Sequence, residues 1–184
     1  MPISQLDPVA ALVIIDLQKG VLAIQTEPPT SVVLERSARL AAAFRAKGLP
    51  VVLVNVVARA PGRTAMTRPF NPPADWHQLA PELGAVDSDI RVTKYNIGAF
   101  HGTGLDMHLR RRGVTQIFLT GVATSSGVEA TARAGHDHGY NVVSVIDAMS
   151  DSDPASHQHA IDVQLKKVGE TATTDEILAA VNAR

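Results

Sequence analysis

Three places in this chain combine residue types and spacing that could carry chemistry. Asp16 directly follows an apolar run, Lys94 lies just past a shorter one, and a turn of small residues at 121–127 follows a third. The carboxyl ends of parallel strands meet at one edge of a sheet, where ligands bind. A carboxylate beside a lysine in a partly dry cleft can give or take a proton, because burial and the neighbouring charge both shift its pKa. A plain salt bridge at the sheet edge would use the same two residues.

The turn at 121–127 adds a second chemical feature, since a helix is predicted to begin there. Unpaired N–H groups at a helix N-terminus stabilise negative charge on a ligand. Position 127, where a nucleophile would stand at the start of this helix, is glycine. The turn therefore has the shape of a nucleophile site without the nucleophile.

The elements that must position these residues follow from hydrophobic periodicity. Apolar runs predict buried parallel strands at residues 9–15, 50–58, 89–93, 116–120 and 141–146, the last ending before Asp147. Helical spacing and capping residues predict helices at residues 31–47, 105–112, 127–138, 152–168 and 173–183. Residues 59–81 lack periodicity and are rich in Pro, Gly and Arg, which predicts a long surface loop. This alternation indicates an α/β fold: a three-layer, doubly wound, mostly parallel sheet of five or six strands with helices on both faces.

Composition favours one globular domain spanning residues 1–184. Hydrophobic residues make up 45% of the chain and charged residues 19%, with a formal net charge of −1. This charge gives no electrostatic reason to expect nucleic acid or an acidic membrane as a partner. The chain has no cysteine, which excludes disulfides, a thiolate nucleophile and cysteine metal sites. Because no run has membrane-spanning length and no signal-peptide pattern is present, we expect a cytoplasmic protein.

Three segments of the chain resemble the signature segments of the isochorismatase-like hydrolase superfamily. They are ALVIIDLQKG (11–20), RVTKYNIGAFHGTGL (91–105) and FLTGVATSSGVEATARAGHDHGY (118–140). The resemblance implies a small-molecule hydrolase without a cofactor, and a homodimer or homotetramer. It also implies that Asp16, Lys94 and position 127 correspond to the Asp, Lys and Cys of the superfamily's triad. Because Gly127 replaces that cysteine, attack by a thiolate is excluded.

True isochorismatases resemble this chain in having glycine at the corresponding position. In them the Asp is understood to protonate the methylene carbon of an enolpyruvyl ether, and water then attacks the resulting cation. The resemblance therefore implies ether hydrolysis with Asp16 as the general acid and Lys94 holding charge and orientation. Two alternatives stay open. One is an inactive relative that binds a small molecule, and the other is an amide hydrolase in which Asp16 activates water.

The resemblance also implies how the turn binds its ligand. Family members often have a non-proline cis peptide here, which corresponds to the bond between Val122 and Ala123. Backbone N–H groups near Ala123 and Gly127, beside Ser126, would then bind a carboxylate or an oxyanion.

Further substrate contacts are expected from outside the turn. In isochorismatases a glutamine follows the second strand, whereas this chain has Ala60-Pro61-Gly62. Arg59 or Arg63 is expected to take over its role or to bind a carboxylate, and the alternative is that both arginines are solvated loop charges. Phe100 and Trp76 are expected to form the apolar wall.

Several histidines and one acidic segment are expected to have no catalytic role. Asp75-Trp76-His77 resembles the metal segment of nicotinamidases, but it lies too far past the second strand, so we predict no metal. The pairs His136 with His138 and His157 with His159 are spaced two apart on predicted helices, which indicates surface positions. No histidine is placed by sequence to activate Ser125 or Ser126.

Overall fold

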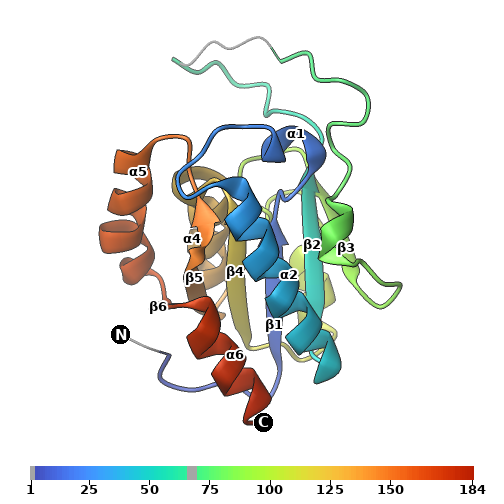
Figure 1. The fold of residues 1–184 in the computed structure, drawn as a ribbon, viewed down its shortest axis with the longest axis vertical. Helices are drawn as coiled ribbons and strands as arrows, with labels where there is room; N and C mark the ends of the chain where they lie inside the picture. The colour runs from blue at the N-terminus through green and yellow to red at the C-terminus, as the bar shows by residue number, and fades with distance from the viewer. Residues whose placement is uncertain (1–2, 66–69) are drawn as a thin grey trace.

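A six-stranded parallel sheet forms the centre of the protein in the computed structural model, which describes residues 3–65 and 70–184. The strand order is β3-β2-β1-β4-β5-β6, and every neighbouring pair is parallel. The strands are β1 (Ala10–Ile15), β2 (Val51–Val56), β3 (Ile90–Lys94), β4 (Gln116–Val122), β5 (Asn141–Ser150) and β6 (Glu170–Ala172). The α-helices are α1 (Lys19–Leu22), α2 (Thr30–Ala46), α3 (Leu105–Arg110), α4 (Glu129–Asp137), α5 (Pro154–His159) and α6 (Thr174–Asn182). Figure 1 shows helices on both sides of the sheet, so the predicted doubly wound α/β fold is confirmed.

The central strand β1 shows why the sheet is covered on both faces. All six of its residues are buried, and successive side chains of a strand point to opposite faces. Ala10, Leu12 and Ile14 belong to the core cluster that includes residues of α2 and α6. Ala11, Val13 and Ile15 belong to the cluster that includes residues of α3 and α4. The unbroken apolar run is thus the pattern of a doubly covered parallel strand.

The chain reverses its direction of winding between β1 and β4. Strands β2 and β3 extend the sheet on one side of β1, while β4, β5 and β6 extend it on the other. In an open α/β sheet this switch point leaves a crevice at the carboxyl ends of the strands. In Figure 1 this edge lies at the top, where α1 and the connection between β2 and β3 are also found.

Two short elements and one strand end differ from the sequence prediction. The four-residue α1 and the three-residue β6 are too short to give a periodic signal. Strand β5 does not stop at residue 146 but continues through Asp147 to Ser150. Oδ1 of Asp147 accepts hydrogen bonds from the N–H and hydroxyl of Thr174, at 2.7 and 2.9 Å, so this carboxylate is satisfied within the strand.

The two helices near the carboxyl edge are less regular than predicted. A π-helical turn, Thr124–Val128, precedes α4 and replaces the first turn of the predicted helix 127–138. The predicted helix 152–168 begins as α5, capped by Asp153, and continues as a π-helical turn (Ala160–Gln164) and a 3₁₀ turn (Leu165–Lys167). One further 3₁₀ turn covers Pro81–Leu83.

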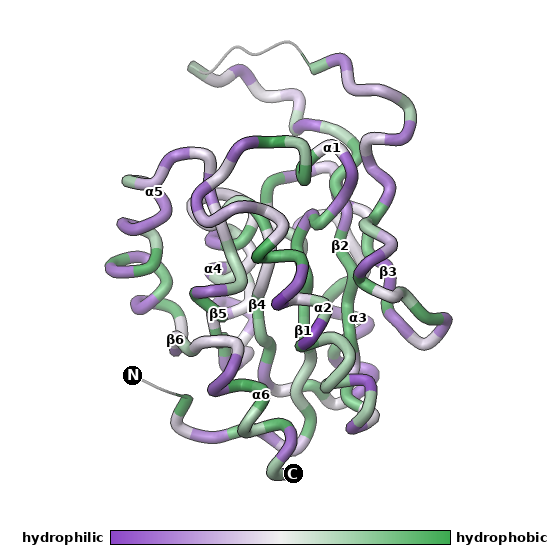
Figure 2. Tube along the Cα trace, viewed as in Figure 1, coloured by the Kyte–Doolittle hydropathy of each residue, from purple (hydrophilic) through white to green (hydrophobic). Residues whose placement is uncertain are grey.

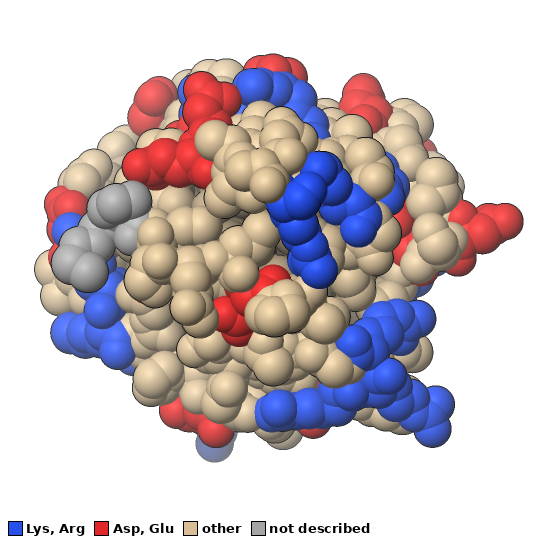
Figure 3. Space-filling model, turned by 90° about the horizontal axis from the view of Figure 1, so that it is seen from below, with Lys and Arg blue, Asp and Glu red and all other residues tan. Residues whose placement is uncertain are grey.

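Apolar and charged residues are distributed as a globular fold requires. Figure 2 shows hydrophobic residues along the central strands and hydrophilic residues on α5 and the connecting segments. Seen from below in Figure 3, acidic and basic side chains are interspersed on the surface. Among the described residues, no helix combines the length and apolar character needed to span a bilayer.

Candidate active site

Asp16 lies at the switch point in a conformation that few non-glycine residues adopt. It directly follows β1, and its φ of 55° places it in the left-handed region. That conformation costs an L-residue about 1 kcal/mol or more, although aspartate tolerates it better than most. The side chain is buried, with the residue 5% exposed. Its Oδ2 lies 2.8 Å from Nζ of Lys94, while Oδ1 is buried and has no hydrogen-bond partner among the described residues.

Lys94 reaches Asp16 from the end of β3, across the intervening strand β2. The residue is 2% exposed, and besides Asp16 its ammonium donates to the carbonyl oxygens of Asn96 at 3.2 Å and Ile97 at 2.9 Å. An ammonium group has three N–H donors, and these three acceptors use all of them. In this geometry Lys94 therefore bonds Asp16 and has no N–H donor left for a substrate. Among the described residues, Oδ1 of Asp16 is the atom of the pair that lacks a hydrogen-bond partner.

The environment of Asp16 favours its protonated form. Burial raises the pKa of Asp16 from 3.8 to about 6, although the charge and hydrogen bond of Lys94 act in the opposite direction. Desolvation dominates because the carboxylate has a single protein donor. An aspartate with this pKa holds a proton at a pH where an ordinary aspartate has lost it, as a general acid requires.

The small-residue turn lies beside this pair, at the end of β4. The peptide bond between Val122 and Ala123 is cis. A Cβ atom built at Gly127 would lie 3.3 Å from Cγ2 of Ile15 and 3.5 Å from the carbonyl oxygen of Ile97, the same oxygen that accepts from Lys94. The structure therefore brings Asp16, Lys94 and Gly127 together, as the sequence predicts.

The backbone of the turn offers donors near its start. Within residues 3–65 and 70–184, the carbonyl oxygen of Ala123 accepts from the N–H groups of Ser126 and Val128, both at 3.1 Å, whereas no acceptor is recorded for the N–H of Ala123 itself. The side chain of Ser126 is exposed. Ala123 and Ser126 thus lie at the start of the helical segment that continues as α4, and a helix N-terminus favours a bound anion.

Backbone hydrogen bonds fix the far end of the β2–β3 connection against the residues that follow Asp16. The N–H of Lys19 donates to Gln78 at 2.8 Å, that of Gly20 to Trp76 at 2.8 Å, and that of Ala80 to Leu17 at 3.0 Å. We call the pairing of residues 17–20 with residues 76–80 the backbone clamp. Residues 66–69 of the predicted surface loop lie outside the described residues, and no helix or strand occurs at 57–65 or 70–80.

Trp76 lies within this clamp and covers Gly20. A Cβ atom at position 20 would meet Cβ and Cε3 of Trp76 at 2.9 Å, so only glycine fits beneath the indole. The ring of Phe70 meets that of Trp76 edge-on, with centroids 5.0 Å apart, and the guanidinium of Arg59 stacks on Phe70 at 4.6 Å. Arg59 and Trp76 therefore share one cluster on the β2–β3 connection, in which both Arg59 and Arg63 are exposed.

Phe100 does not join this group, and its expected place in an apolar wall is wrong. The residue is 6% exposed and belongs to the core cluster between the sheet and α4. Its ring stacks on His138 with centroids 5.0 Å apart and lies 5.8 Å from that of Tyr140. Both partners follow the C-terminal end of α4, opposite the turn. The hydrophobicity of Phe100 serves the core rather than the candidate site.

His157 is the site-proximal residue that sequence reasoning missed. The expected surface position is wrong, because its Nδ1 lies 2.8 Å from Oγ1 of the buried Thr124, the first residue of the π-helical turn. The other three histidines of the two pairs are exposed, as predicted. Helical spacing within α5 carries no signal of a contact with a turn 33 positions earlier.

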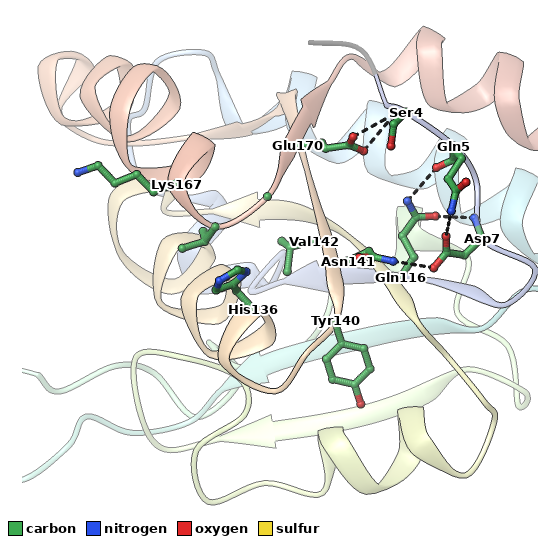
Figure 4. Close-up of a pocket in the computed structure, with 12 residues that line it drawn as sticks. Ser4, Gln5, Asp7, Gln116, His136, Tyr140, Asn141, Val142, Lys167 and Glu170 are labelled. Atoms are coloured by element: carbon green, nitrogen blue, oxygen red, sulfur yellow. Dashed lines mark hydrogen bonds between the residues drawn. The ribbon is translucent and has the colours of Figure 1, made fainter.

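A cavity of about 280 Å³ lies at the opposite, amino-terminal edge of the sheet (Figure 4). Several of its polar groups are already bonded: Asp7 accepts from Asn141 at 3.0 Å and Thr115 at 2.6 Å, and the side chain of Gln116 bonds the backbone of both Asp7 and Gln5. It contains none of the residues at the carboxyl edge. We therefore place the candidate active site at Asp16 and not in this cavity.

Comparison with known proteins agrees with this arrangement, since residues 10–176 match the isochorismatase domain family. The chain belongs to the isochorismatase-like hydrolase superfamily. It is 40% identical over 179 residues to the uncharacterized isochorismatase family protein YecD of Escherichia coli O157:H7, covering 93% of this chain and 95% of YecD. A solved isochorismatase family protein from Burkholderia thailandensis, 40% identical, has a TM-score of 0.92 and covers 97% of this chain and 98% of its own.

A relative with a stated reaction is more distant. The ureidoacrylate amidohydrolase RutB of Methylobacterium radiotolerans is 34% identical over 154 residues, or 71% of this chain and 60% of RutB. The superfamily thus includes a hydrolase of carbon–nitrogen bonds among the relatives of this chain.

Proposed function

We propose that this isochorismatase-like hydrolase cleaves the ether bond of a small carboxylate, such as an enolpyruvyl ether, with Asp16 as the general acid. The observation that carries the proposal is the state of Asp16: a buried carboxyl with a pKa of about 6 and an unpartnered Oδ1. Gly127 supports it, because the position next to this acid has no side chain that could attack a carbonyl.

The reaction can be written with this chain's own residues. The proton on Oδ1 of Asp16 passes to the methylene carbon of the enolpyruvyl group, which becomes a methyl group while positive charge develops on the adjacent carbon and the ether oxygen. Water adds to that carbon and returns a proton to Asp16. The resulting hemiketal releases the alcohol and leaves pyruvate, so no covalent enzyme intermediate is required.

The neighbouring groups have separate roles in this proposal. Lys94 holds Asp16 in place and stabilises the carboxylate after the proton has left. The backbone N–H groups near Ala123 and Gly127, with Ser126 beside them, bind the substrate carboxylate. Arg59 and Trp76 supply the polar and apolar parts of the substrate wall. We further propose that the working enzyme is a homodimer or homotetramer.

Amide hydrolysis is the second candidate, and the similarity to RutB is the observation that favours it. In that case Asp16 would act as a base toward water. Its raised pKa argues against this role at acidic pH, because the protonated form cannot accept a proton. A protein that binds a small molecule without turnover is the remaining alternative.

A turnover panel on the purified protein tests these candidates. Pyruvate release is followed from isochorismate and related enol ethers, and ammonia release from ureidoacrylate, nicotinamide and other small amides. The proposal expects pyruvate release that disappears in Asp16→Asn, which keeps the shape of the side chain and removes its proton. Ammonia release would favour water-dependent amide hydrolysis, and silence across the panel would favour the binding protein.

A further inference from the structure

The connection between β5 and α5 holds the candidate anion-binding turn from the side opposite Lys94. Oδ2 of Asp151 accepts hydrogen bonds from the N–H of Ser125 at 2.9 Å and from its hydroxyl at 2.7 Å. One residue earlier in the turn, Oγ1 of Thr124 lies 2.8 Å from Nδ1 of His157. Two successive residues of the turn are therefore fixed by two side chains that no catalytic step uses.

The side chain of Thr124 is positioned to support the turn and not to attack a substrate. Its side chain belongs to a residue that is 0% exposed, and His157 is the hydrogen-bond partner recorded for its hydroxyl. A hydroxyl so enclosed has no path to a reacting carbon, whereas a buried hydroxyl that lost its partner would be costly. The pair thus ties Thr124, which follows the cis-bonded Val122–Ala123 pair, to α5.

The environment of His157 favours the neutral form of its imidazole at neutral pH. Burial lowers the pKa of His157, although the nearby charges of Asp151 and Glu27 act in the opposite direction. A neutral imidazole with its proton on Nε2 can accept a hydrogen bond from the Thr124 hydroxyl at Nδ1. Glu27 is joined to the same connection, since its N–H donates to the carbonyl oxygen of Asp151 at 2.9 Å.

We propose that His157 is a positioning residue that acts through Thr124 to aim the backbone donors of the 123–127 turn at the ligand's oxygen, with Asp151 fixing the adjacent residue. This role rests on the proposed function, in which that turn binds the substrate carboxylate. A shift of about 1 Å at such donors lowers turnover substantially, so the bond affects turnover more than affinity in the ground state.

Amide hydrogen exchange on the free protein tests the support of the turn without any ligand. Thr124→Val and His157→Phe each remove the bond while keeping similar volume, and Thr124→Ser and His157→Asn retain a hydroxyl and an acceptor. The N–H groups of Ser126 and Val128, both bonded to Ala123, are expected to exchange about tenfold faster in each disruptive variant. The double disruptive variant is expected to exchange no faster than either single variant, because both remove the same bond.

Steady-state kinetics on the substrate found in the turnover panel tests the functional part. The disruptive variants are expected to lower kcat by about tenfold with little change in KM, and the conservative variants to restore it. His159→Phe is the matched control, since His159 lies two residues further on and is exposed. That variant is expected to match the wild type in both measurements.

The outcomes separate this proposal from the proposed function. Unchanged exchange at Ser126 and Val128, or additive acceleration in the double variant, would overturn the Thr124–His157 link. Faster exchange with unchanged kcat would make His157 merely structural and would also overturn its positioning role. A wild-type protein silent in the whole panel would refute the proposed function, while the exchange data would still decide whether the pair holds the turn.

Discussion

The rate of ether hydrolysis is expected to fall as the pH rises through about 6. The reason is that Asp16 must carry its proton to act as the acid, and burial sets its pKa at about 6. Above that value, kcat/KM is expected to decrease about tenfold for each pH unit, since the protonated fraction falls by that factor.

The burial of Asp16 sets the size of the effect. At pH 7 an aspartate with the ordinary pKa of 3.8 is protonated roughly 150-fold less often than one with a pKa of about 6. Lys94 opposes the shift, so its replacement by methionine is expected to raise the pKa further and to move the falling limb to higher pH.

The assay is an initial-rate measurement of pyruvate release between pH 4.5 and 8.5 at constant ionic strength. Asp16→Asn is the first control and is expected to be inactive at every pH. Because that variant leaves Lys94 buried without its carboxylate, it also loses about 3 kcal/mol of stability. The paired variant Asp16→Asn with Lys94→Met removes both charges, so its inactivity could not be attributed to an unpaired lysine.

A rate that rises with pH through 6 would refute this reasoning, since it would show Asp16 acting as a base. A pH–rate profile that does not fall near pH 6 would equally contradict the conclusion that burial raises the pKa of Asp16.

The same pKa shift has a consequence for stability with a definite sign. The folded protein holds the Asp16 proton more tightly than the unfolded chain does, because its pKa is raised on folding. The stabilisation is therefore fully present below pH 4 and is lost as the pH rises through about 6. Urea unfolding of the wild type and the paired variant at pH 4 and pH 7 measures the difference.

Three further predictions concern the turn at the site and two stabilising contacts elsewhere in the fold. Gly127→Ala is expected to lower the free energy of unfolding by about 1 kcal/mol, because the new Cβ lies 3.3 Å from its nearest neighbour. Gly121→Ala is expected to lower it by about 3 kcal/mol or more, since φ is 118° and the Cβ would lie 2.0 Å from a β1 carbonyl oxygen. Thermal unfolding of the two variants makes the comparison. Asp89→Asn is expected to lose about 3 kcal/mol in urea unfolding, because Arg45 forms a two-pronged bond to this buried carboxylate at 2.8 and 3.0 Å. Thr173→Ala removes the capping box of α6 and is expected to lower stability by about 1 kcal/mol, which circular dichroism during thermal unfolding detects.

Sequence predicted those parts of the fold that depend on long, regular patterns. The doubly covered β1 is an unbroken apolar run and its neighbours β2 and β4 are mostly apolar, and Asp16 is recognisable because it is the first polar residue after β1. The same rule fails at Asp147, which is expected to follow the end of a strand. Its carboxylate is satisfied by Thr174, far along the chain, and a strand can therefore pass through it.

The remaining parts of the site depend on contacts between distant segments. His157 lies in a short helix whose spacing indicates only a surface, yet it meets Thr124 because α5 packs beside the turn. Phe100 shows the reverse error, since an aromatic residue near Lys94 in sequence lies at the other end of α4. Nor does residue type reveal that Lys94 has used all three of its donors, two of them on backbone oxygens.

The backbone clamp has a consequence for how this protein could be redesigned. Residues 17–20 hold residues 76–80 through main-chain hydrogen bonds, and the buried side chain of Gln18 adds bonds to the carbonyl oxygens of Trp76 and Val56. Gly20 is equally constrained, because Trp76 leaves no space for a larger residue there. A library that randomises the exposed neighbouring side chains while keeping Gln18, Gly20 and Trp76 is expected to preserve this attachment. The anchoring of this segment thus depends on three fixed residue positions as well as on the main chain.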